Sequence, residues 1–215
     1  MQARTSETAQ RVRQDGLVAI VRGNFSQAQI MGMAEVLLNA EVPVMEVTLN
    51  TTSALAAIQM LRQHFGDKLL VGAGTVRTAD QFQQALDAGA QFTVAPNLDL
   101  ATVALAQQHD LLHLPGVFTP SEVQNAFVAG CRMVKLFPSE IVGPRYLKAL
   151  RAPLDDIDLV PTGGITPENI ADYVRAGAAA TGIGSALITG PQQSLDDLTA
   201  RAHALRAAWN AAVRK

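Results

Sequence analysis

Short runs rich in β-branched residues alternate with helical patterns along the whole sequence, and this alternation restricts the possible folds more than any other feature. Glycine-centred helix ends recur at 88–90, 129–131 and 176–178, and each leads into a strand pattern. Glycine at such a place is the expected left-handed helix cap. A strand and a helix that alternate about every 20 to 25 residues are typical of βα units and of a parallel sheet.

The alternation yields eight strands, and their number predicts the fold class. About eight βα units that close on themselves form an α/β fold of the (β/α)8 type, the TIM barrel, here with an N-terminal helix before the first strand. An open, doubly wound sheet is the alternative, because the number of strands does not prove closure. The predicted strands are 17–22, 44–49, 69–75, 91–96, 111–115, 132–137, 157–162 and 179–184.

Polar capping residues mark the expected starts of four helices. At each start, a Ser or Thr precedes the helical pattern, and a Gln, Glu or Pro follows at the spacing of an N-terminal cap. These starts are Ser26 with Gln29, Thr78 with Gln81, Thr119 with Pro120 and Glu122, and Thr166 with Pro167 and Glu168.

Length and charge limit the domain organisation and the partners. No low-complexity or charge-rich segment divides the chain, which is 48% hydrophobic, so we expect a single domain over residues 1–215. The net charge is −2 and the 17 basic residues are scattered, so we expect a small metabolite as partner, with no nucleic acid and no membrane. The polar N-terminal segment lacks the apolar core of a signal peptide, which favours a cytoplasmic location.

Lys135 lies in a segment that otherwise has the pattern of a buried strand. Burial removes solvation from the charged amine, so its pKa should fall and the neutral, nucleophilic amine should be populated near pH 7. A lysine in that state can form a Schiff base. The alternative is a lysine whose stem is buried while its ammonium reaches solvent at the rim.

Functional residues of barrel enzymes lie at the C-terminal ends of the strands. Alternation along the second predicted strand places Glu46 opposite Met45 and Val47, so Glu46 should point into the barrel. The same parity turns Lys135 and Phe137 inward. An enclosed glutamate and lysine form either a structural ion pair or a nucleophile with its proton shuttle. Other residues at these ends are Arg22, Thr48, Thr75, Pro96, Asn97, Thr162, Gly163, Gly164, Gly184 and Ser185.

Two glycine turns follow the seventh and eighth predicted strands, in VPTGGITPEN (160–169) and TGIGSAL (181–187). Backbone N–H groups and a helix N-terminus at such turns form the phosphate cradle that recurs in these barrels. Gly163 and Gly164 alone are equally well explained as tight-turn glycines. Together with Gly184 and Ser185, they favour a phosphate site.

The histidines and the cysteine do not point to a metal. The four histidines lack the spacing of metal ligands, and we predict no metal. His113 lies in a predicted strand, where a core histidine with satisfied hydrogen bonds is more common than a ligand. Cys131 is the only cysteine, so it supplies neither a disulfide framework nor a metal motif.

Seven motifs between residues 17 and 187 resemble those of the 2-keto-3-deoxy-6-phosphogluconate (KDPG) aldolases. This family includes 4-hydroxy-2-oxoglutarate (KHG) aldolase activity and the sister phosphogalactonate (KDPGal) aldolases. The resemblance implies a class I aldolase on a (β/α)8 barrel, usually a homotrimer, that requires no cofactor. The motifs are MEVTLNT (45–51), VGAGTV (71–76), VAPNL (94–98), LPGVFTPSE (114–122), MVKLFPSEIVGP (133–144), VPTGGITPEN (160–169) and GIGSAL (182–187).

The resemblance also implies a role for each residue at a matching position. Lys135 resembles the Schiff-base lysine, and Glu46 resembles the acid/base that works with a bound water. Three further residues match those that line the pyruvyl pocket, namely Thr75, Pro96 and Phe137. The phosphate site of the family matches Gly163, Gly164, Gly184 and Ser185.

One departure from the family pattern concerns the substrate carboxylate. Many members carry an arginine directly after the MEVTL-type strand, where it holds this carboxylate, but here that position is Asn50. Phosphogalactonate enzymes and some phosphogluconate enzymes carry an arginine at the end of the first strand instead, and Arg22 resembles that residue. An alternative role for Arg22 is to pair with Glu46 and tune its pKa.

The function predicted from the sequence is reversible cleavage of KDPG to pyruvate and glyceraldehyde 3-phosphate, with KHG as a further substrate. KDPGal aldolase activity is the first alternative. A phosphate-binding barrel isomerase or synthase is a more remote one, because fold does not fix function. A barrel that only binds a phosphorylated metabolite would need neither Lys135 nor Glu46.

Overall fold

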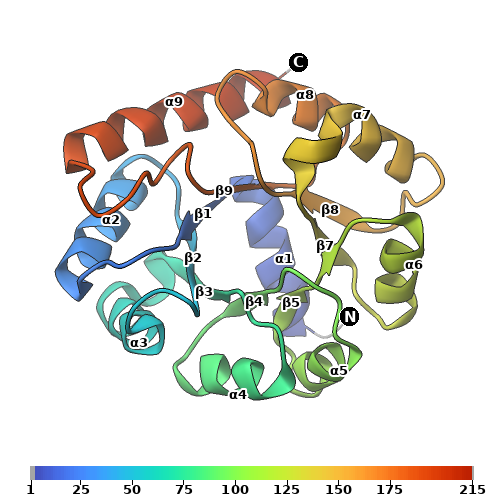
Figure 1. Ribbon diagram of the computed structural model, residues 1–215, viewed down its shortest axis with the longest axis horizontal. Coiled ribbons are helices and arrows are strands. Elements are labelled where there is room, and N and C mark those ends of the chain that lie inside the picture. Colours follow the sequence, from blue (N-terminus) through green and yellow to red (C-terminus); the bar gives the residue numbers. More distant parts are fainter. Residues whose placement is uncertain (1–2, 215) are drawn as a thin grey trace.

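The computed structural model describes residues 3–214, and it has an α/β fold built on parallel strands (Figure 1). The strands are β1 (Leu17–Val21), β2 (Val44–Thr48), β3 (Leu70–Gly74), β4 (Phe92–Val94), β5 (Leu112–Leu114), β6 (Gly116–Val117), β7 (Met133–Leu136), β8 (Asp158–Pro161) and β9 (Thr181–Ile183). The helices are α1 (Ala3–Asp15), α2 (Gln27–Asn39), α3 (Ala54–Phe65), the 3-10 helix η1 (Gly66–Lys68), α4 (Ala79–Asp87), α5 (Leu100–Gln108), α6 (Pro120–Val128), α7 (Ser139–Arg151), α8 (Ile170–Arg175) and α9 (Leu195–Val213).

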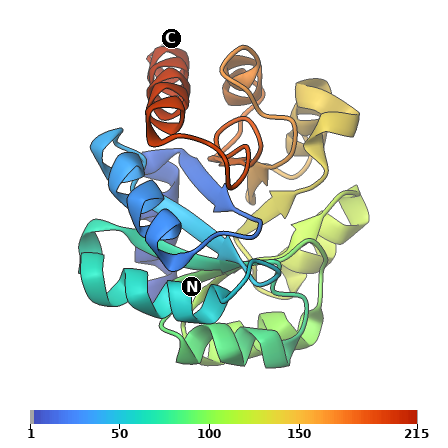
Figure 2. The ribbon, with the colours of Figure 1, turned by 60° about the vertical axis from the view of Figure 1, so that its left-hand side comes forward.

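Two parallel sheets curl around a common centre. Six strands form one sheet in the order β5-β4-β3-β2-β1-β9, and β6-β7-β8 form the other. Figure 1 shows the strands near the centre with most of the helices outside them, and Figure 2 shows the same layering from another side. The eight predicted strands are all present, and α1 precedes the first of them as expected.

The fifth predicted strand contributes to both sheets. Its first part, β5, pairs with β4, while its continuation, β6, pairs with β7 through the register Gly116 to Lys135. Pro115 lies between the two parts and has no N–H to donate, but its carbonyl accepts a bond of 3.0 Å from the N–H of Lys135. On the opposite side, a parallel bridge between Thr162 and Gly182 joins the end of β8 to β9.

Side-chain alternation divides the buried residues into an outer and an inner cluster. Met45, Val47 and Val134 belong to the outer cluster, which lies between strands and helices. Val44 and Met133 belong to the inner cluster, which the strands enclose. Glu46 and Lys135 lie two residues after Val44 and Met133, so they share the inner face of their strands. Their predicted inward orientation is therefore confirmed.

Helix α1 contributes to the inner cluster through Ala9 and Val12. Figure 1 shows this helix behind the centre of the ring of strands. The Asp110 carboxylate accepts bonds of 3.0 Å from the backbone N–H groups of Arg4 and Thr5, which caps the start of the helix. The helix therefore covers the N-terminal ends of the strands.

Capping residues explain where several helices begin. The predicted capping boxes at Ser26 and Thr119 are both present, and Thr78 accepts a bond from the N–H of Gln81. The helix predicted to open at Thr166 starts later, at Ile170. The side chain of Asn169 accepts a 2.9 Å bond from the N–H of Thr166, which holds the intervening segment in a turn.

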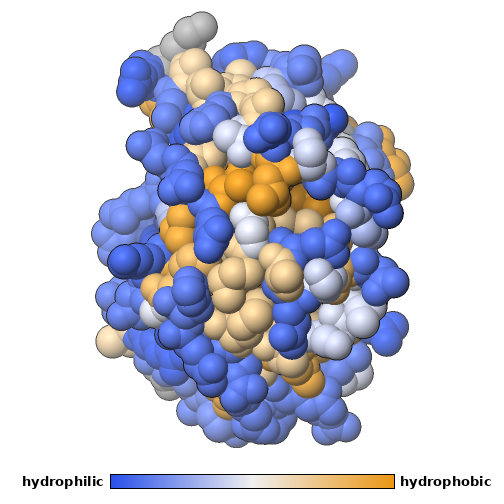
Figure 3. Space-filling model, turned by 90° about the vertical axis from the view of Figure 1, so that its left-hand side faces the viewer, coloured by the Kyte–Doolittle hydropathy of each residue, from blue (hydrophilic) through white to orange (hydrophobic). Residues whose placement is uncertain are grey.

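Apolar side chains gather between polar ones on the face that is on the left in Figure 1, near α2 (Figure 3). Leu195, at the start of α9, is 49% exposed and lies close to Gly32 of α2. Within residues 3–214, none of the helices is long and apolar enough to cross a membrane.

Candidate active site

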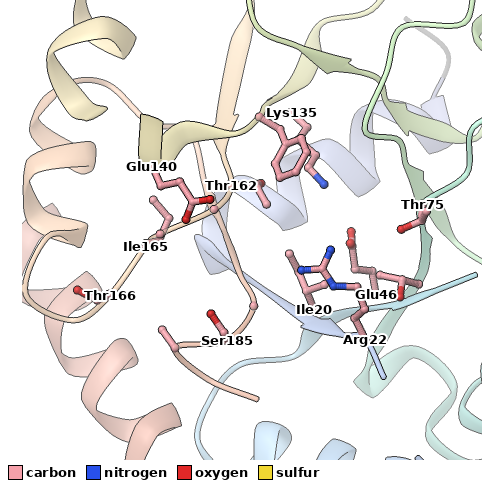
Figure 4. Close-up of a pocket in the computed structure, with 16 residues that line it drawn as sticks. Ile20, Arg22, Glu46, Thr75, Lys135, Glu140, Thr162, Ile165, Thr166 and Ser185 are labelled. Carbon is pink, nitrogen blue, oxygen red and sulfur yellow. The ribbon is translucent and has the colours of Figure 1, made fainter. Parts of the chain in front are cut away.

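A cavity of about 410 Å³ opens at the C-terminal ends of the strands (Figure 4). Four of its lining residues are charged: Arg22 directly follows β1, Glu46 lies on β2, Lys135 lies on β7 and Glu140 lies on α7. Two glycine turns complete the wall. The lining residues are Ile20, Arg22, Glu46, Thr48, Thr75, Lys135, Phe137, Glu140, Thr162, Gly163, Gly164, Ile165, Thr166, Gly184, Ser185 and Ala186.

Lys135 extends from β7 into this cavity, and it is only 8% exposed. Its Nζ lies 4.6 Å from the centroid of the Phe137 ring. Burial lowers the pKa of Lys135, the nearby charge of Arg22 lowers it further, and Glu46 opposes both. The predicted burial of this lysine is confirmed, and the downward shift of its pKa favours the nucleophilic amine.

Glu46 extends from β2 and is 2% exposed. Its carboxylate lies against the backbone of β3, because a Cβ built on Gly74 would be 2.4 Å from Oε1 of Glu46. Glycine at position 74 therefore makes room for the carboxylate. Burial raises the pKa of Glu46, while Lys135 and then Arg22 lower it. The upward shift favours the protonated carboxyl group, as an acid/base in proton transfer requires.

Lys135 and Glu46 share the cavity without a close ion pair. In the part of the chain that the structure describes, the ion pairs within 4.0 Å involve other residues. Burial shifts the two pKa values in opposite directions, toward an uncharged amine and an uncharged acid. This arrangement fits a nucleophile with a separate proton carrier better than it fits a structural ion pair.

Threonine hydroxyls fix the end of β1, which precedes Arg22. The Oγ1 atoms of Thr48 and Thr51 donate to the carbonyl of Val21 at 3.3 and 3.2 Å, and the two oxygens are 3.1 Å apart. In Figure 4 the guanidinium of Arg22 lies beside Glu46, in the middle of the cavity. Arg22 is therefore placed where it can reach either a bound carboxylate or Glu46.

The glycine turns lie at the other end of the cavity. Gly163 and Gly164 have φ angles of 98° and 70°, a left-handed conformation that suits glycine. Within residues 3–214, no recorded hydrogen bond uses the N–H of either glycine as a donor. A Cβ built on Gly184 would meet nothing within 4 Å, so this residue faces open space. The side chain of Ser185 points toward the same space in Figure 4.

All predicted site residues except Pro96 line the cavity. The carbonyl of Pro96 lies against β6, because a Cβ built on Gly116 would be 2.4 Å from this oxygen. Asn50 occupies the position at which many members of the family carry an arginine, and it does not line the cavity. Arg22 does line it, and is therefore the candidate arginine of the site.

Sequence reasoning missed Glu140, the fourth charged residue of the cavity. Glu140 follows Phe137 and Pro138 in the first turn of α7, and strand parity says nothing about helix positions. The sequence signal that could have identified Glu140 was its place in the MVKLFPSEIVGP motif. In the structure this residue lies beside the glycine turn that follows β8. Ile165, Thr166 and Ala186 also line the cavity and were not singled out.

His113 lies outside the cavity, and its hydrogen bonding differs from the prediction. Its Nδ1 is 2.8 Å from the hydroxyl of Thr93, but Nε2 is buried without a partner in the described chain. The prediction of a fully satisfied core histidine is therefore wrong for one ring nitrogen. Burial lowers the pKa of His113 to about 4, although the nearby Asp99 opposes the shift.

The fold and the cavity together define a class of protein. Parallel βα units that place buried charged groups and glycine turns at the C-terminal ends of the strands are characteristic of α/β enzymes. The chain belongs to the KDPG and KHG aldolase family, whose model matches residues 8–200. The predicted family is thus confirmed.

Relatives of two named activities match the sequence. A probable 2-dehydro-3-deoxy-6-phosphogalactonate aldolase of Rhizobium meliloti is 34% identical over 91% of this chain and 92% of its own length. A 2-dehydro-3-deoxy-phosphogluconate aldolase of Treponema pallidum is 41% identical, over 66% of this chain and 68% of its own. Both relatives are named as aldolases, one for the phosphogalactonate and one for the phosphogluconate substrate.

Solved structures of the same family are also similar. A structure described as native KDPGal is 34% identical and covers 93% of this chain and 96% of its own, with a TM-score of 0.88. The KDPG aldolase of Legionella pneumophila, with pyruvate captured as a covalent carbinolamine intermediate, is 27% identical, with a TM-score of 0.81 and 98% of each chain covered.

Proposed function

We propose that this protein is a class I aldolase that cleaves KDPG reversibly to pyruvate and glyceraldehyde 3-phosphate. The observation that carries the proposal is the buried Lys135, whose amine shares one cavity with the carboxyl group of Glu46. The covalent carbinolamine in the Legionella relative supports an amine that adds to the ketone of pyruvate. KHG is the further substrate that the family name suggests.

In this proposal Lys135 is the nucleophile, and the iminium ion that it forms with the substrate is the electrophile that accepts electrons during cleavage. Its neutral amine adds to the C2 ketone to give a carbinolamine, and loss of water gives an iminium ion. The iminium accepts the electron pair of the C3–C4 bond as that bond breaks, which leaves an enamine. The low pKa that burial gives Lys135 keeps the amine ready for the first addition.

Glu46 is proposed to carry the protons. It takes the proton of the C4 hydroxyl, directly or through a water molecule, while the aldehyde forms. It then helps to protonate C3 of the enamine, and water releases pyruvate from the lysine. The pKa of Glu46 is raised by burial, so the carboxyl group can hold the proton between these two steps.

The remaining polar groups are proposed to hold the two ends of the substrate. Arg22 pairs with the carboxylate, because its planar guanidinium can bind two oxygens at once. Thr75 and Phe137 shape the pyruvyl end. At the other end, the glycine turns bind the phosphate through backbone N–H groups; these are the turns that contain Gly163, Gly164, Gly184 and Ser185.

KDPGal is the second candidate substrate, and two observations favour it. Arg22 lines the cavity while Asn50 does not, as the phosphogalactonate pattern requires. The Rhizobium KDPGal relative also matches over nearly the whole of both chains. Cleavage assays with KDPG, KDPGal and KHG side by side separate these candidates, and the largest kcat/KM identifies the substrate.

We also propose that the two sheets are parts of one closed (β/α)8 barrel in a single domain over residues 1–215. Support comes from the strand that contributes to both sheets and from the bridge between Thr162 and Gly182. A homotrimer is proposed from the family resemblance, and the apolar side chains near α2 offer a surface for subunit contact (Figure 3).

Trapping with borohydride tests the proposed reaction. Pyruvate and borohydride together are expected to inactivate the enzyme and to leave a reduced adduct on Lys135, which peptide mass spectrometry identifies. Lys148→Arg is a matched control, because Lys148 lies on α7 outside the cavity. An adduct on another lysine, or none, contradicts the class I mechanism and favours a phosphate-sugar isomerase or synthase.

A further inference from the structure

The charges of the cavity are unevenly distributed between its two ends. Arg22, Glu46 and Lys135 lie together at one end, and Glu140 lies near the glycine turn at the other (Figure 4). Of the described residues that line the cavity, Glu140 is therefore the charged group nearest the turn, and it is negative. The proposed phosphate site offers backbone N–H groups but no lysine or arginine.

Glu140 touches this glycine turn. A Cβ built on Gly164 would lie 2.5 Å from Cβ of Glu140 and 3.3 Å from its Oε2. A Cβ built on Gly163 would lie 3.9 Å from Cδ of the same side chain. The carboxylate thus lies along the turn whose N–H groups are proposed to bind phosphate. Glu140 is also exposed to solvent.

Two elements hold Glu140 in this place. The N–H of Ser139 donates to the carbonyl of Thr162 at 2.9 Å, and the hydroxyl of Tyr173 donates to the carbonyl of Ser139 at 3.2 Å. These bonds fix the start of α7 beside the turn that follows β8. The position of Glu140 is therefore a consequence of the fold and not of an ion pair.

We infer that Glu140 is a specificity-determining residue that opposes a phosphate dianion in the glycine turn. This inference rests on the proposed function. A phosphate bound there meets a carboxylate of like charge, which weakens the phosphate contribution to binding. An unphosphorylated substrate with a neutral terminal hydroxyl meets no such repulsion. Glu140 consequently limits the preference for phosphorylated substrates.

The test compares KDPG or KDPGal with the unphosphorylated 2-keto-3-deoxy acid of the same configuration. For each enzyme, the ratio of the two kcat/KM values measures the phosphate preference. Glu140→Gln is expected to raise this ratio about 3- to 20-fold, the range for removing one nearby like charge in a solvated site.

Control variants separate charge from structure. Glu140→Asp keeps the negative charge and should keep a ratio close to that of wild type. Glu35→Gln removes one negative charge from an exposed position of α2, outside the cavity, and should leave the ratio unchanged. High salt should shrink the difference between wild type and Glu140→Gln, because ions screen exposed charges. Inorganic phosphate should also inhibit Glu140→Gln at lower concentrations than wild type.

The outcomes are distinct. A ratio that stays the same or falls in Glu140→Gln overturns the inference, and so does a difference that high salt leaves intact. If the wild-type enzyme cleaves neither the phosphorylated nor the unphosphorylated acid, the proposed function fails instead. Thermal unfolding of both Glu140 variants identifies any loss of folding.

Discussion

Replacing His113 by glutamine is expected to make the stability of the protein less sensitive to acid. In the folded state, burial lowers the pKa of His113 to about 4, whereas a histidine in the unfolded chain titrates at its ordinary value of 6.5. The unfolded state therefore binds a proton at higher pH than the folded state does. The stabilising contribution is complete above about pH 6.5 and is lost as the pH falls toward 4.

The size of this effect follows from the two pKa values. The difference between the two pKa values corresponds to roughly 3 kcal/mol. Between pH 7 and pH 4.5, the loss attributable to His113 is about 2 kcal/mol, because protonation of the folded state is still incomplete. Losses of that size are a large fraction of the free energy of unfolding of an ordinary domain.

Urea unfolding of wild type and His113→Gln, followed by circular dichroism from pH 7 to 4.5, measures the effect. The variant loses the ring and its 2.8 Å contact with Thr93, so it is expected to be less stable at pH 7. The decisive quantity is the pH dependence of the free energy of unfolding, which should be shallower in the variant by about 2 kcal/mol over this range. Parallel curves for wild type and His113→Gln would refute the reasoning. His203→Gln changes an exposed histidine and should reproduce the wild-type curve.

Three further predictions concern the cavity. Glu46→Gln is expected to lower kcat about 10²- to 10⁴-fold while borohydride still traps some pyruvate on Lys135, because an acid/base moves protons more than it binds substrate; a loss below tenfold returns Glu46 to a structural role. Gly184→Leu is expected to abolish the preference for phosphorylated substrates and to spare KHG, since the leucine side chain would project into the open space where the phosphate is proposed to bind. Equal losses of activity on phosphorylated substrates and on KHG indicate misfolding. Arg22→Lys keeps the charge but loses the planar fork, so KM for pyruvate in the synthetic direction should rise with little change in the pH profile of cleavage; a shifted acidic limb with constant KM means that Arg22 serves Glu46.

Strand periodicity accounts for what could be predicted from the sequence. The alternation in 44–49 was sufficient to turn Glu46 inward, because the opposite face of that strand is wholly apolar. The same parity turned Lys135 inward, opposite Val134 and Leu136. Helix caps such as Ser26 and Thr119 located helix starts, since their hydrogen bonds are local. Both kinds of signal depend only on residues close together in the sequence.

Contacts between distant segments were not predictable in the same way. The proximity of Glu140 to Gly164 depends on how α7 and the turn after β8 meet, and neither segment carries a pattern that reports this. The unpartnered Nε2 of His113 likewise depends on what surrounds a buried strand. The family resemblance assigned Pro96 to the pyruvyl pocket, but Pro96 does not line the cavity and its carbonyl lies against β6.

The helix that covers the N-terminal ends of the strands has a consequence for the order of events in a catalytic cycle. Among the described residues, those that line the cavity come from the opposite ends of the strands, and none belongs to α1. Lys135 is deep in this cavity, and the glycine turns are nearer its mouth. Under the proposed mechanism, the aldehyde product stands between the lysine-bound fragment and solvent. Product release should therefore be ordered, with the aldehyde leaving first and pyruvate last, and pyruvate should inhibit the cleavage reaction as the product that binds the free enzyme.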